Sequence, residues 1–261
     1  MDVPRIHFLG HATVLVEVDG LRLLTDPILR HRVTFLGRVA PRTDLTGLGP
    51  VDAVLISHLH HDHADVPSLR LLPRDTPVLA PIGSAAFFAR LGFSDVHELG
   101  VGDQWRPQPT SLAGLRIGAT RAVHHGHRVP FGPRAESIGF LIESGATSVY
   151  FAGDTDIFPG MADLHPQLDA ALLPVWGWGP NLGPGHMDPH RAALALDLLR
   201  PRYAIPIHWG TLFPLGLRVL GGRVSAVLDQ PPRVFQALAT ATRPECTVLL
   251  TQPGGVAELT P

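Results

Sequence analysis

Residues 58–63, with the sequence His-Leu-His-His-Asp-His, constrain this chain more than any other segment. They follow residues 51–57 directly, a continuous apolar run that predicts a buried strand. Side chains two residues apart on an extended chain point the same way, so His58 and His60 can converge on one cation. The pattern therefore predicts a metal site at the end of this strand.

Asp62 and His63 lie beyond the bend that ends the strand, and they can serve a second cation. Imidazole and carboxylate groups suit Zn²⁺ and its neighbours among the transition metals. The alternative is a solvated, histidine-rich loop without a metal, but the spacing of the four side chains favours the metal site.

The composition indicates a globular protein with a large core. The chain has 261 residues, 45% of them hydrophobic and only 17% charged, which argues against disorder. We expect a single domain over residues 1–261. The formal net charge of −2 favours neither nucleic acid nor a polybasic membrane contact, so we expect no nucleic-acid partner.

The cysteine content and the N-terminal sequence point to the cytoplasm. The one cysteine, Cys246, excludes an internal disulfide framework and is expected to be buried and inert. The first residues show no signal-peptide pattern. No apolar run approaches the roughly 20 residues that span a bilayer, so we expect no transmembrane segment.

The order of strands and helices predicts an α/β fold with two mixed sheets and helices outside them. Asp19-Gly20 between two β-branched runs predicts a hairpin, and Asp188 is placed to cap a helix that starts at Pro189. Residues 28–50 are expected to form a long loop. The predicted strands are residues 6–9, 13–18, 21–25, 51–57, 77–80, 115–123, 137–143, 148–152, 169–175, 203–207 and, last, 247–251. The predicted helices are residues 67–72, 83–91, 189–199 and 232–242.

Three more candidate ligands follow predicted strands later in the chain. His124 comes after residues 115–123, Asp154 after 148–152 and His208 after 203–207. One such residue alone is more often a turn or capping residue. Three of them at the ends of three strands indicate that the metal site is assembled from several loops on one edge of the fold.

The ordered set of these residues resembles the metallo-β-lactamase superfamily. Within it, the chain is most similar to the branch that contains the N-acyl-phosphatidylethanolamine-hydrolysing phospholipase D and the ascorbate-6-phosphate lactonase-like proteins. The segments that carry the resemblance are Leu-Gly-His-Ala-Thr-Val-Leu at 9–15, Leu-Thr-Asp-Pro at 24–27, Val-Asp-Ala-Val-Leu-Ile-Ser-His at 51–58, Gly-Asp-Thr at 153–155, His-Met-Asp-Pro at 186–189 and Ile-His-Trp-Gly-Thr at 207–211.

The resemblance implies a four-layer αββα sandwich and a centre of two divalent metal ions. One ion would be bound by His58, His60 and His124, the other by Asp62, His63 and His208. Asp154 would bridge the two ions. His125 and His127 remain alternatives to His124. Zn²⁺ is the favoured metal, with Mn²⁺ or Fe as alternatives. A hydroxide shared by the ions would attack phosphorus or a carbonyl carbon.

Four residues are candidates for roles beside the ligands. Together with Asp62, His186 is assigned to catalysis, as a substrate-binding or proton-donating group; the alternative is a plain loop histidine. His11 either orients a ligand or stabilises the first hairpin. Asp26 is expected to hydrogen-bond a metal-binding histidine. Arg128 contacts either a phosphate or a carboxylate.

The substrate is expected to be a small molecule, and the resemblance favours a phosphodiester. Residues 33–39 and 212–220, with Trp176 and Trp178, either line a mouth for apolar groups or pack against the body of the protein. A lactone or other cyclic ester is the alternative substrate. A metal-bearing binding or regulatory module without turnover is the alternative class, although all seven ligand positions are filled. The sequence leaves open whether the chain forms a homo-oligomer.

Overall fold

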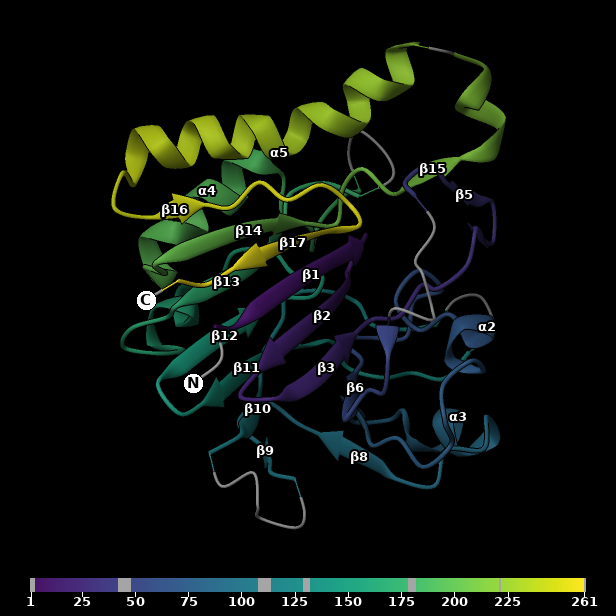
Figure 1. The fold of residues 1–261 in the computed structure, drawn as a ribbon. Coiled ribbons are helices and arrows are strands. Elements are labelled where there is room, and N and C mark those ends of the chain that lie inside the picture. Colours follow the sequence, from purple (N-terminus) through teal and green to yellow (C-terminus); the bar gives the residue numbers. More distant parts are fainter. Residues whose placement is uncertain are drawn as a thin grey trace.

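The computed structural model describes residues 3–41, 48–107, 114–128, 132–177, 182–220 and 222–260. Within them the strands form two seven-stranded sheets and one small three-stranded sheet (Figure 1). Both large sheets are mixed, because each contains parallel and antiparallel neighbours. The predicted α/β class is confirmed.

The first sheet has the strand order β17-β1-β2-β3-β6-β7-β8. Asp19 and Gly20 both have positive φ, 48° and 79°, which makes the predicted tight turn between β2 and β3. From β3 onward the neighbours β6, β7 and β8 are parallel. The strands are β1 (Arg5–Gly10), β2 (Thr13–Val18), β3 (Leu21–Thr25), β6 (Ala53–Leu55), β7 (Val78–Pro81), β8 (Val96–Leu99) and β17 (Gly255–Glu258).

The second sheet has the order β16-β14-β13-β12-β11-β10-β9. Strands β12, β13, β14 and β16 are parallel, and β11 is antiparallel to both of its neighbours. The strands are β9 (Gln104–Trp105), β10 (Arg116–Arg121), β11 (Ile138–Ser144), β12 (Thr147–Phe151), β13 (Ala170–Pro174), β14 (Tyr203–Ile207) and β16 (Thr247–Val248).

The two sheets face each other across one apolar core, in which Phe8, Phe140 and Phe151 are fully buried. Burial of this apolar surface is the main force that holds the layers together. The second sheet is covered by α4 (Pro189–Leu199) and α5 (Gly222–Thr242), as Figure 1 shows. Next to α4 lies the short helix η2 (Pro159–Asp163).

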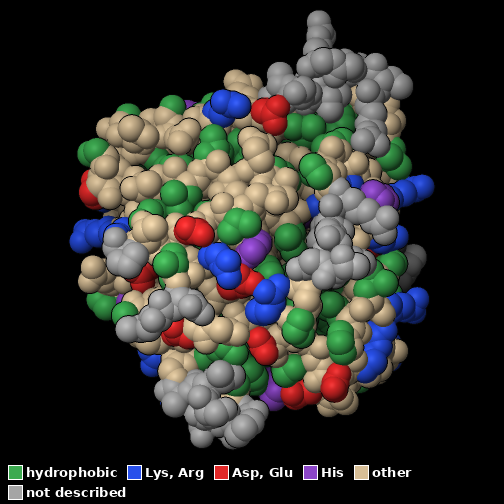
Figure 2. All heavy atoms as spheres, in the orientation of Figure 1, with side chains coloured by type: hydrophobic (Ala, Val, Ile, Leu, Met, Phe, Trp, Pro, Cys, Tyr) green, Lys and Arg blue, Asp and Glu red, His purple; other side chains and the backbone are tan. Residues whose placement is uncertain are grey.

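Two short helices accompany the parallel half of the first sheet. Leu69 of α2 (Val66–Leu69) and Phe88 of α3 (Ala85–Arg90) are buried in a second apolar cluster with residues of β6 and β7. The antiparallel half of that sheet carries charges instead, since Glu17 on β2 pairs with Arg5 and Arg22. Figure 2 shows basic and acidic side chains mixed over this face. No helix in the described part of the chain is both long enough and apolar enough to cross a membrane.

The prediction of a long loop over residues 28–50 is wrong for residues 32–38. Strands β4 (Arg32–Val33) and β5 (Leu36–Arg38) form a hairpin there, and β5 pairs with β15 (Leu212–Pro214). The helix η3 (Leu215–Leu220) follows β15. Pairing over such a distance along the chain leaves no signal in local periodicity, which explains the error.

The apolar residues of this small sheet mostly pack against the body. Val33, Leu36 and Leu212 are buried together with Ile28, whereas Phe35 is 54% exposed. Trp176 is buried as well, and Trp178 lies outside the described residues. Most of the side chains that the structure describes in these segments therefore pack against the body of the protein and do not line a mouth for apolar groups.

Two predicted elements near the C-terminus have different bounds. The helix expected at residues 232–242 begins ten residues earlier, at Gly222, and runs through Pro231 and Pro232. Proline usually ends or starts a helix, so the sequence pattern favoured a start there. The strand expected at residues 247–251 ends at Val248, and β17 follows as the last strand.

The cap of α4 provides a test of local stability. Asp188 Oδ1 accepts a hydrogen bond of 2.8 Å from the backbone N–H of Arg191, as the sequence predicts. Replacing Asp188 with Ala should lower the free energy of unfolding by about 1 kcal/mol. Urea denaturation of the metal-loaded protein measures this change. The matched control Asp188→Asn keeps a capping acceptor and should stay near the native value; equal losses in both variants would contradict the capping role.

Candidate metal centre

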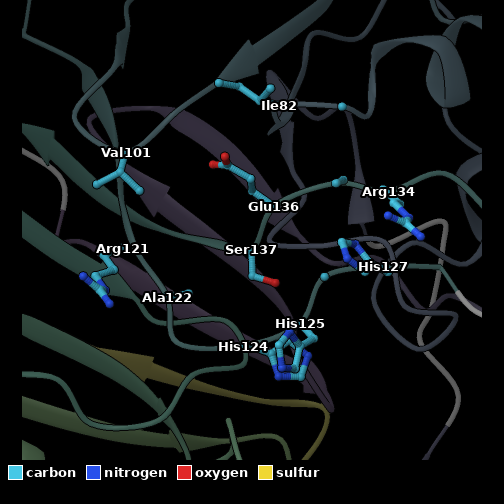
Figure 3. Close-up of a pocket in the computed structure, with 13 residues that line it drawn as sticks. Ile82, Val101, Arg121, Ala122, His124, His125, His127, Arg134, Glu136 and Ser137 are labelled. Atoms are coloured by element: carbon cyan, nitrogen blue, oxygen red, sulfur yellow. The ribbon is translucent and has the colours of Figure 1, made fainter.

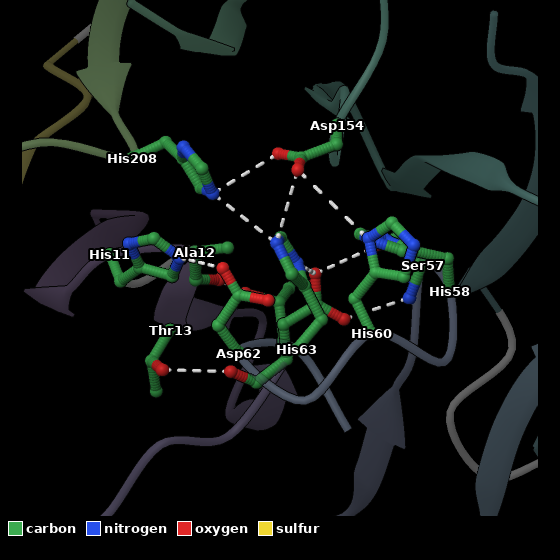
Figure 4. A network of polar contacts seen from close by, with 12 residues as sticks. His11, Ala12, Thr13, Ser57, His58, His60, Asp62, His63, Asp154 and His208 are labelled. Atoms are coloured by element: carbon green, nitrogen blue, oxygen red, sulfur yellow. Dashed lines mark hydrogen bonds and ion pairs between the residues drawn. The ribbon is translucent and has the colours of Figure 1, made fainter. Parts of the chain in front are cut away.

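The predicted ligands lie together because the strands that carry them end at one edge of the double sheet. His58 follows β6, Asp154 follows β12 and His208 follows β14. Strands β3 and β6 are parallel, as are β12, β13 and β14, so each sheet presents its carboxyl ends at this edge. The β1–β2 turn with His11 reaches the same edge, because β2 runs antiparallel to β3. Figure 4 shows the resulting cluster.

The first group consists of His58, His60 and His124. One ring nitrogen of each lies within 4.8 Å of the others. The closest pair is His124 Nε2 and His60 Nδ1, 3.2 Å apart. The structure thus brings His124 to the centre; in the described residues, His125 and His127 belong to no such group.

The second group consists of Asp62, His63 and His208, joined by His11. His208 Nε2 lies 3.2 Å from His63 Nε2. His11 Nε2 lies 3.1 Å from Asp62 Oδ2, and its ring centroid lies 3.8 Å from that of His208, with the two rings tilted by 36°. His11 is therefore part of the site itself, and its backbone bonds the β1–β2 turn to the segment after β14, since His11 N donates to Thr211 Oγ1 and the His11 carbonyl accepts from His208 N.

Asp154 lies between the two groups. Its Oδ2 is 3.3 Å from His63 Nε2 and 4.0 Å from His58 Nε2, and its Oδ1 is 3.2 Å from His208 Nε2. The carboxylate is almost completely buried. Asp154 is thus the residue whose position fits a ligand shared by two cations.

The buried carboxylate of Asp26 orients the histidines of both groups. His63 Nδ1 donates to Asp26 Oδ2 at 2.8 Å, which leaves His63 Nε2 facing the centre. The Ser57 hydroxyl donates to the same oxygen at 2.6 Å. Since that proton is used, Ser57 Oγ can only accept from His58 Nδ1, 3.0 Å away, which leaves His58 Nε2 free to bind. The expected hydrogen bond from a ligand histidine to Asp26 is present.

Backbone carbonyls orient two further histidines. His208 Nδ1 donates to the carbonyl of Trp176 at 2.8 Å, and His124 Nδ1 donates to that of Gly185 at 3.0 Å. In both rings Nε2 is left as the acceptor that faces the cluster. Outer hydrogen bonds of this kind fix the tautomer and orientation of metal-binding histidines.

The donor atoms fit a pair of divalent cations. In the neutral forms that metal binding requires, His63 Nε2 and His208 Nε2 would point lone pairs at each other across 3.2 Å, which is unfavourable unless a proton or a cation lies between them. Among the described residues, His58 Nε2 and Asp154 Oδ1 are buried without a hydrogen-bond partner. Buried polar atoms are normally satisfied, so these orphaned atoms are the places where cations would bind.

The pKa values of the clustered histidines are shifted in different directions. Burial lowers the pKa of His58 well below its usual value, that of His124 to about 4 and that of His208 to about 3. These rings are neutral near pH 7, as metal binding requires. Burial also opposes charge on His63, but the carboxylates of Asp154 and Asp26 outweigh it and raise the pKa of His63 well above 6.5.

The two carboxylates of the cluster are held in their charged forms. Burial raises the pKa of Asp62, but the hydrogen bond from His11 and the neighbouring histidines outweigh it, so the pKa is lowered. Burial likewise opposes charge on Asp154, but His208 and His63 lower its pKa well below 3.8. Both residues can therefore act as anionic ligands.

Backbone strain is concentrated at the centre. His11, Asp26 and His208 have φ values of 57°, 35° and 64°, in the left-handed region that residues with a Cβ rarely adopt. Hydrogen bonds hold these conformations, such as that from His208 N to the His11 carbonyl at 2.7 Å. Strain of this kind costs about 1–3 kcal/mol per residue and persists where the surroundings impose it.

His186 lies at the open side of the cluster. Its Nε2 is 3.5 Å from Asp154 Oδ2, and its side chain is 19% exposed. Burial lowers its pKa, but the hydrogen bond and charge of Asp154 outweigh this and raise it. His186, Asp154 and His124 also form a group with metal-binding geometry. His186 therefore lies in the site as predicted. Its position suits either a proton donor or a further metal ligand.

Arg128 has partners other than those considered from the sequence. Its guanidinium donates to the carbonyls of Leu59 and Ala64, at 3.0 and 2.8 Å, and to His61 Nδ1 at 2.9 Å. Neither a phosphate nor a carboxylate is needed to explain its position. Arg128 instead braces the loop that carries four of the predicted ligands.

Sequence reasoning missed the residues that act through the backbone. Trp176 and Gly185 contribute carbonyl oxygens, which no side-chain pattern reveals. Gly153 has φ +60°, and a Cβ there would lie 2.6 Å from Ser57 Cβ. The position of Gly153 directly before Asp154 could have predicted this contact, because glycine is common where two backbone segments approach closely.

This double sheet, with clustered histidines and aspartates at one edge, defines a metal-dependent hydrolase. The chain belongs to the metallo-β-lactamase superfamily, since the family model described as the β-lactamase superfamily domain matches residues 21–209. A UPF0173 metal-dependent hydrolase of Opitutus terrae is 33% identical over 216 residues, which cover 79% of this chain and 85% of that protein. The more specific likeness to the phospholipase branch stays a prediction.

Solved structures share the fold. Igni18, a metallo hydrolase from Ignicoccus hospitalis, superposes with a TM-score of 0.74 at 23% identity and covers 98% of both chains. The isothiocyanate hydrolase from Delia radicum gut bacteria gives a TM-score of 0.70 at 18% identity, over 97% of this chain and 98% of that one. At these identities the likeness concerns architecture alone.

The charge on His63 can be tested by proton release. Because its pKa is raised, His63 favours its protonated form and must lose a proton to bind a cation. Zn²⁺ binding should therefore release this proton in addition to any lost by metal-bound water, and the share from His63 should fade as the pH rises through the raised pKa. Calorimetry in two buffers of different ionisation enthalpy measures the number of protons released. The His63→Asn variant should release fewer protons than the native protein. If the heat of Zn²⁺ binding to the native protein were the same in both buffers, the raised pKa of His63 would be refuted.

Proposed function

We propose that this chain hydrolyses phosphodiesters, with two divalent cations held by the seven residues predicted from the sequence. The observation that carries the proposal is the pair of ligand groups joined by Asp154, whose two oxygens face different histidines. His58, His60 and His124 would hold one cation, and Asp62, His63 and His208 the other. The cations, when bound, supply the Lewis acidity that activates water and stabilises negative charge on phosphate oxygens.

The charge of the centre supports an anionic substrate. The two cations would contribute four positive charges, the carboxylates of Asp62 and Asp154 with the attacking hydroxide three negative ones, and the bound histidines none. The net positive charge is complementary to a phosphodiester monoanion. A neutral lactone would gain less from it before the reaction begins.

His186 is the residue suited to move a proton. It lies at the open side of the cluster, and the hydrogen bond and charge of Asp154 raise its pKa, which favours the protonated ring. The carbonyl of Gly183 accepts from Nδ1 at 3.4 Å, so Nε2 is the nitrogen that faces the reaction space. In the proposed reaction His186 donates this proton to the departing alkoxide, because an alkoxide is a poor leaving group without one.

Other nucleophiles in the chain are less suited. Cys246, the one cysteine, is buried next to β16, and burial raises the pKa of its thiol to about 11. A thiol in that state forms little thiolate near neutral pH. The expectation of a buried cysteine is met.

Parallel assays with Zn²⁺-, Mn²⁺- and Fe²⁺-loaded protein test the proposal. The substrates are bis(p-nitrophenyl) phosphate, a γ-lactone and benzyl isothiocyanate. We expect turnover of the phosphodiester, and a drop of roughly a hundredfold or more in Asp62→Ala with an unchanged circular dichroism spectrum. The exposed Asp75→Ala serves as control. Turnover of the lactone or isothiocyanate alone, or full activity of Asp62→Ala, would overturn the proposal.

A second variant separates the two roles open to His186. If His186 donates a proton, His186→Ala should lower kcat about a hundredfold for a dialkyl phosphodiester, whose alkoxide needs that proton, and much less for bis(p-nitrophenyl) phosphate, while metal content per chain stays at the native value. Plasma emission spectrometry gives the metal content of the same samples used for kinetics. A loss of bound metal in parallel with kcat would identify His186 as a ligand instead.

A further inference from the structure

The ring of His11 contacts two candidate ligands, and both belong to the second ligand group. His11 Nε2 lies 3.1 Å from Asp62 Oδ2 (Figure 4). An ionised carboxylate accepts hydrogen bonds only, so Nε2 carries the proton and donates it to Asp62. The ring centroid of His11 also lies 3.8 Å from that of His208. One side chain thus contacts two ligands of the same cation.

The position of the His11 ring is fixed by distant parts of the chain. The side chain has no solvent exposure. Its backbone N–H donates to Thr211 Oγ1 at 2.7 Å, and its carbonyl accepts from His208 N at 2.7 Å. These bonds hold the β1–β2 turn against the segment after β14, so the ring meets Asp62 from a rigid support.

Two features of His11 are unfavourable for a residue that only stabilises a turn. Its φ of 57° lies in the left-handed region, which glycine and asparagine adopt more easily than histidine. Its Nδ1 is buried without a hydrogen-bond partner among the described residues, which is costly in any protonation state of the ring. Strain and unpaired polar atoms at one residue indicate a function for its side chain.

The two ligand groups differ in their access to solvent. His124 of the first group lines a cavity of about 670 Å³, and Figure 3 shows its ring at the cavity wall beside that of His125. The described residues that line this cavity include the exposed Val101 but no member of the second group. His63 and His208 are instead buried. On the buried side of the second group a side chain, rather than water, has to hold the Asp62 carboxylate.

We propose that His11 is a positioning residue for the second cation. Its Nε2–H holds Asp62 Oδ2, and its ring packs against His208, so that both ligands are set for the same ion. A hydrogen bond to one carboxylate oxygen orients the group and favours binding of a cation through the other oxygen. The proposal rests on the two cations of the proposed function and is independent of which bond is hydrolysed.

Zn²⁺ titration of the metal-free chain against a chromogenic chelator tests the proposal. The native protein should bind two Zn²⁺ ions, and His11→Asn should weaken one of them about 10- to 100-fold while the other keeps its affinity. Asparagine tolerates the left-handed φ but is too short to reach Asp62. The matched control His7→Asn, on β1 of the same hairpin, should bind both ions like the native protein. Circular dichroism checks that each variant is folded.

The His11→Gln variant separates hydrogen bonding from packing. The glutamine amide can donate to Asp62 as Nε2 does, although it lacks the ring that packs against His208. His11→Gln should therefore recover most of the affinity that His11→Asn loses. Equal losses of Zn²⁺ affinity in the two variants would overturn the positioning role.

Ligand variants identify which cation is affected. His60→Asn removes a ligand of the first group, and the addition of His11→Asn should weaken the remaining Zn²⁺ about 10- to 100-fold. His63→Asn removes a ligand of the second group, and the addition of His11→Asn should then have no effect on the remaining ion. The reverse pattern, or no effect in either background, would overturn the proposal.

The same measurements distinguish this proposal from the proposed function. A native protein that binds two Zn²⁺ ions but cleaves no phosphodiester would contradict the proposed function and leave the role of His11 intact. A native protein that binds one Zn²⁺ ion would contradict both. Two native ions whose affinities are unchanged in His11→Asn would overturn the role of His11 alone.

Discussion

The metal centre depends on the buried carboxylate of Asp26. Asp26 has no solvent exposure, and it accepts hydrogen bonds from Ser57 N, Ser57 Oγ and His63 Nδ1. These bonds join the end of β3 to the start of the histidine loop, and they set the tautomer of two candidate ligands. A carboxylate buried without such partners would be costly, so the network and its charge stabilise each other.

Once Asp26 holds the loop, the rest of the site is a matter of strand geometry. Parallel strands bring Asp154 and His208 to the same edge, and the carbonyls of Trp176 and Gly185 turn the remaining rings inward. The strained backbone at His11 and His208 belongs to the same arrangement, since one hydrogen bond joins the two residues. These contacts fix the positions of the candidate ligands, and fixing ligands in advance reduces the cost of binding a cation.

Short-range patterns in the sequence predicted the histidine cluster and the hairpin. They did not predict which strands far apart along the chain pair with each other. The apolar run before His58 and the Asp19-Gly20 turn carry short-range signals, and the cluster and hairpin were predicted from them. The pairing of β5 with β15 and the start of α5 depend on partners far along the chain, so periodicity could not reveal them. Arg128 shows the same limit at the site, because its partners are carbonyl oxygens that have no counterpart in residue type.

The pairing of β1 with β17 has a consequence for how the chain acquires this structure. The first strand forms its outer hydrogen bonds with residues 255–258, and the candidate ligands span residues 58 to 208. During synthesis the outer edge of β1 therefore stays unpaired until residues 255–258 are made, and the cluster is incomplete until His208 is made. Folding of such a topology is dominated by long-range contacts and is slow. Until β17 arrives, one side of β1 is an open strand edge, which is the part of the nascent chain most prone to pair with another copy.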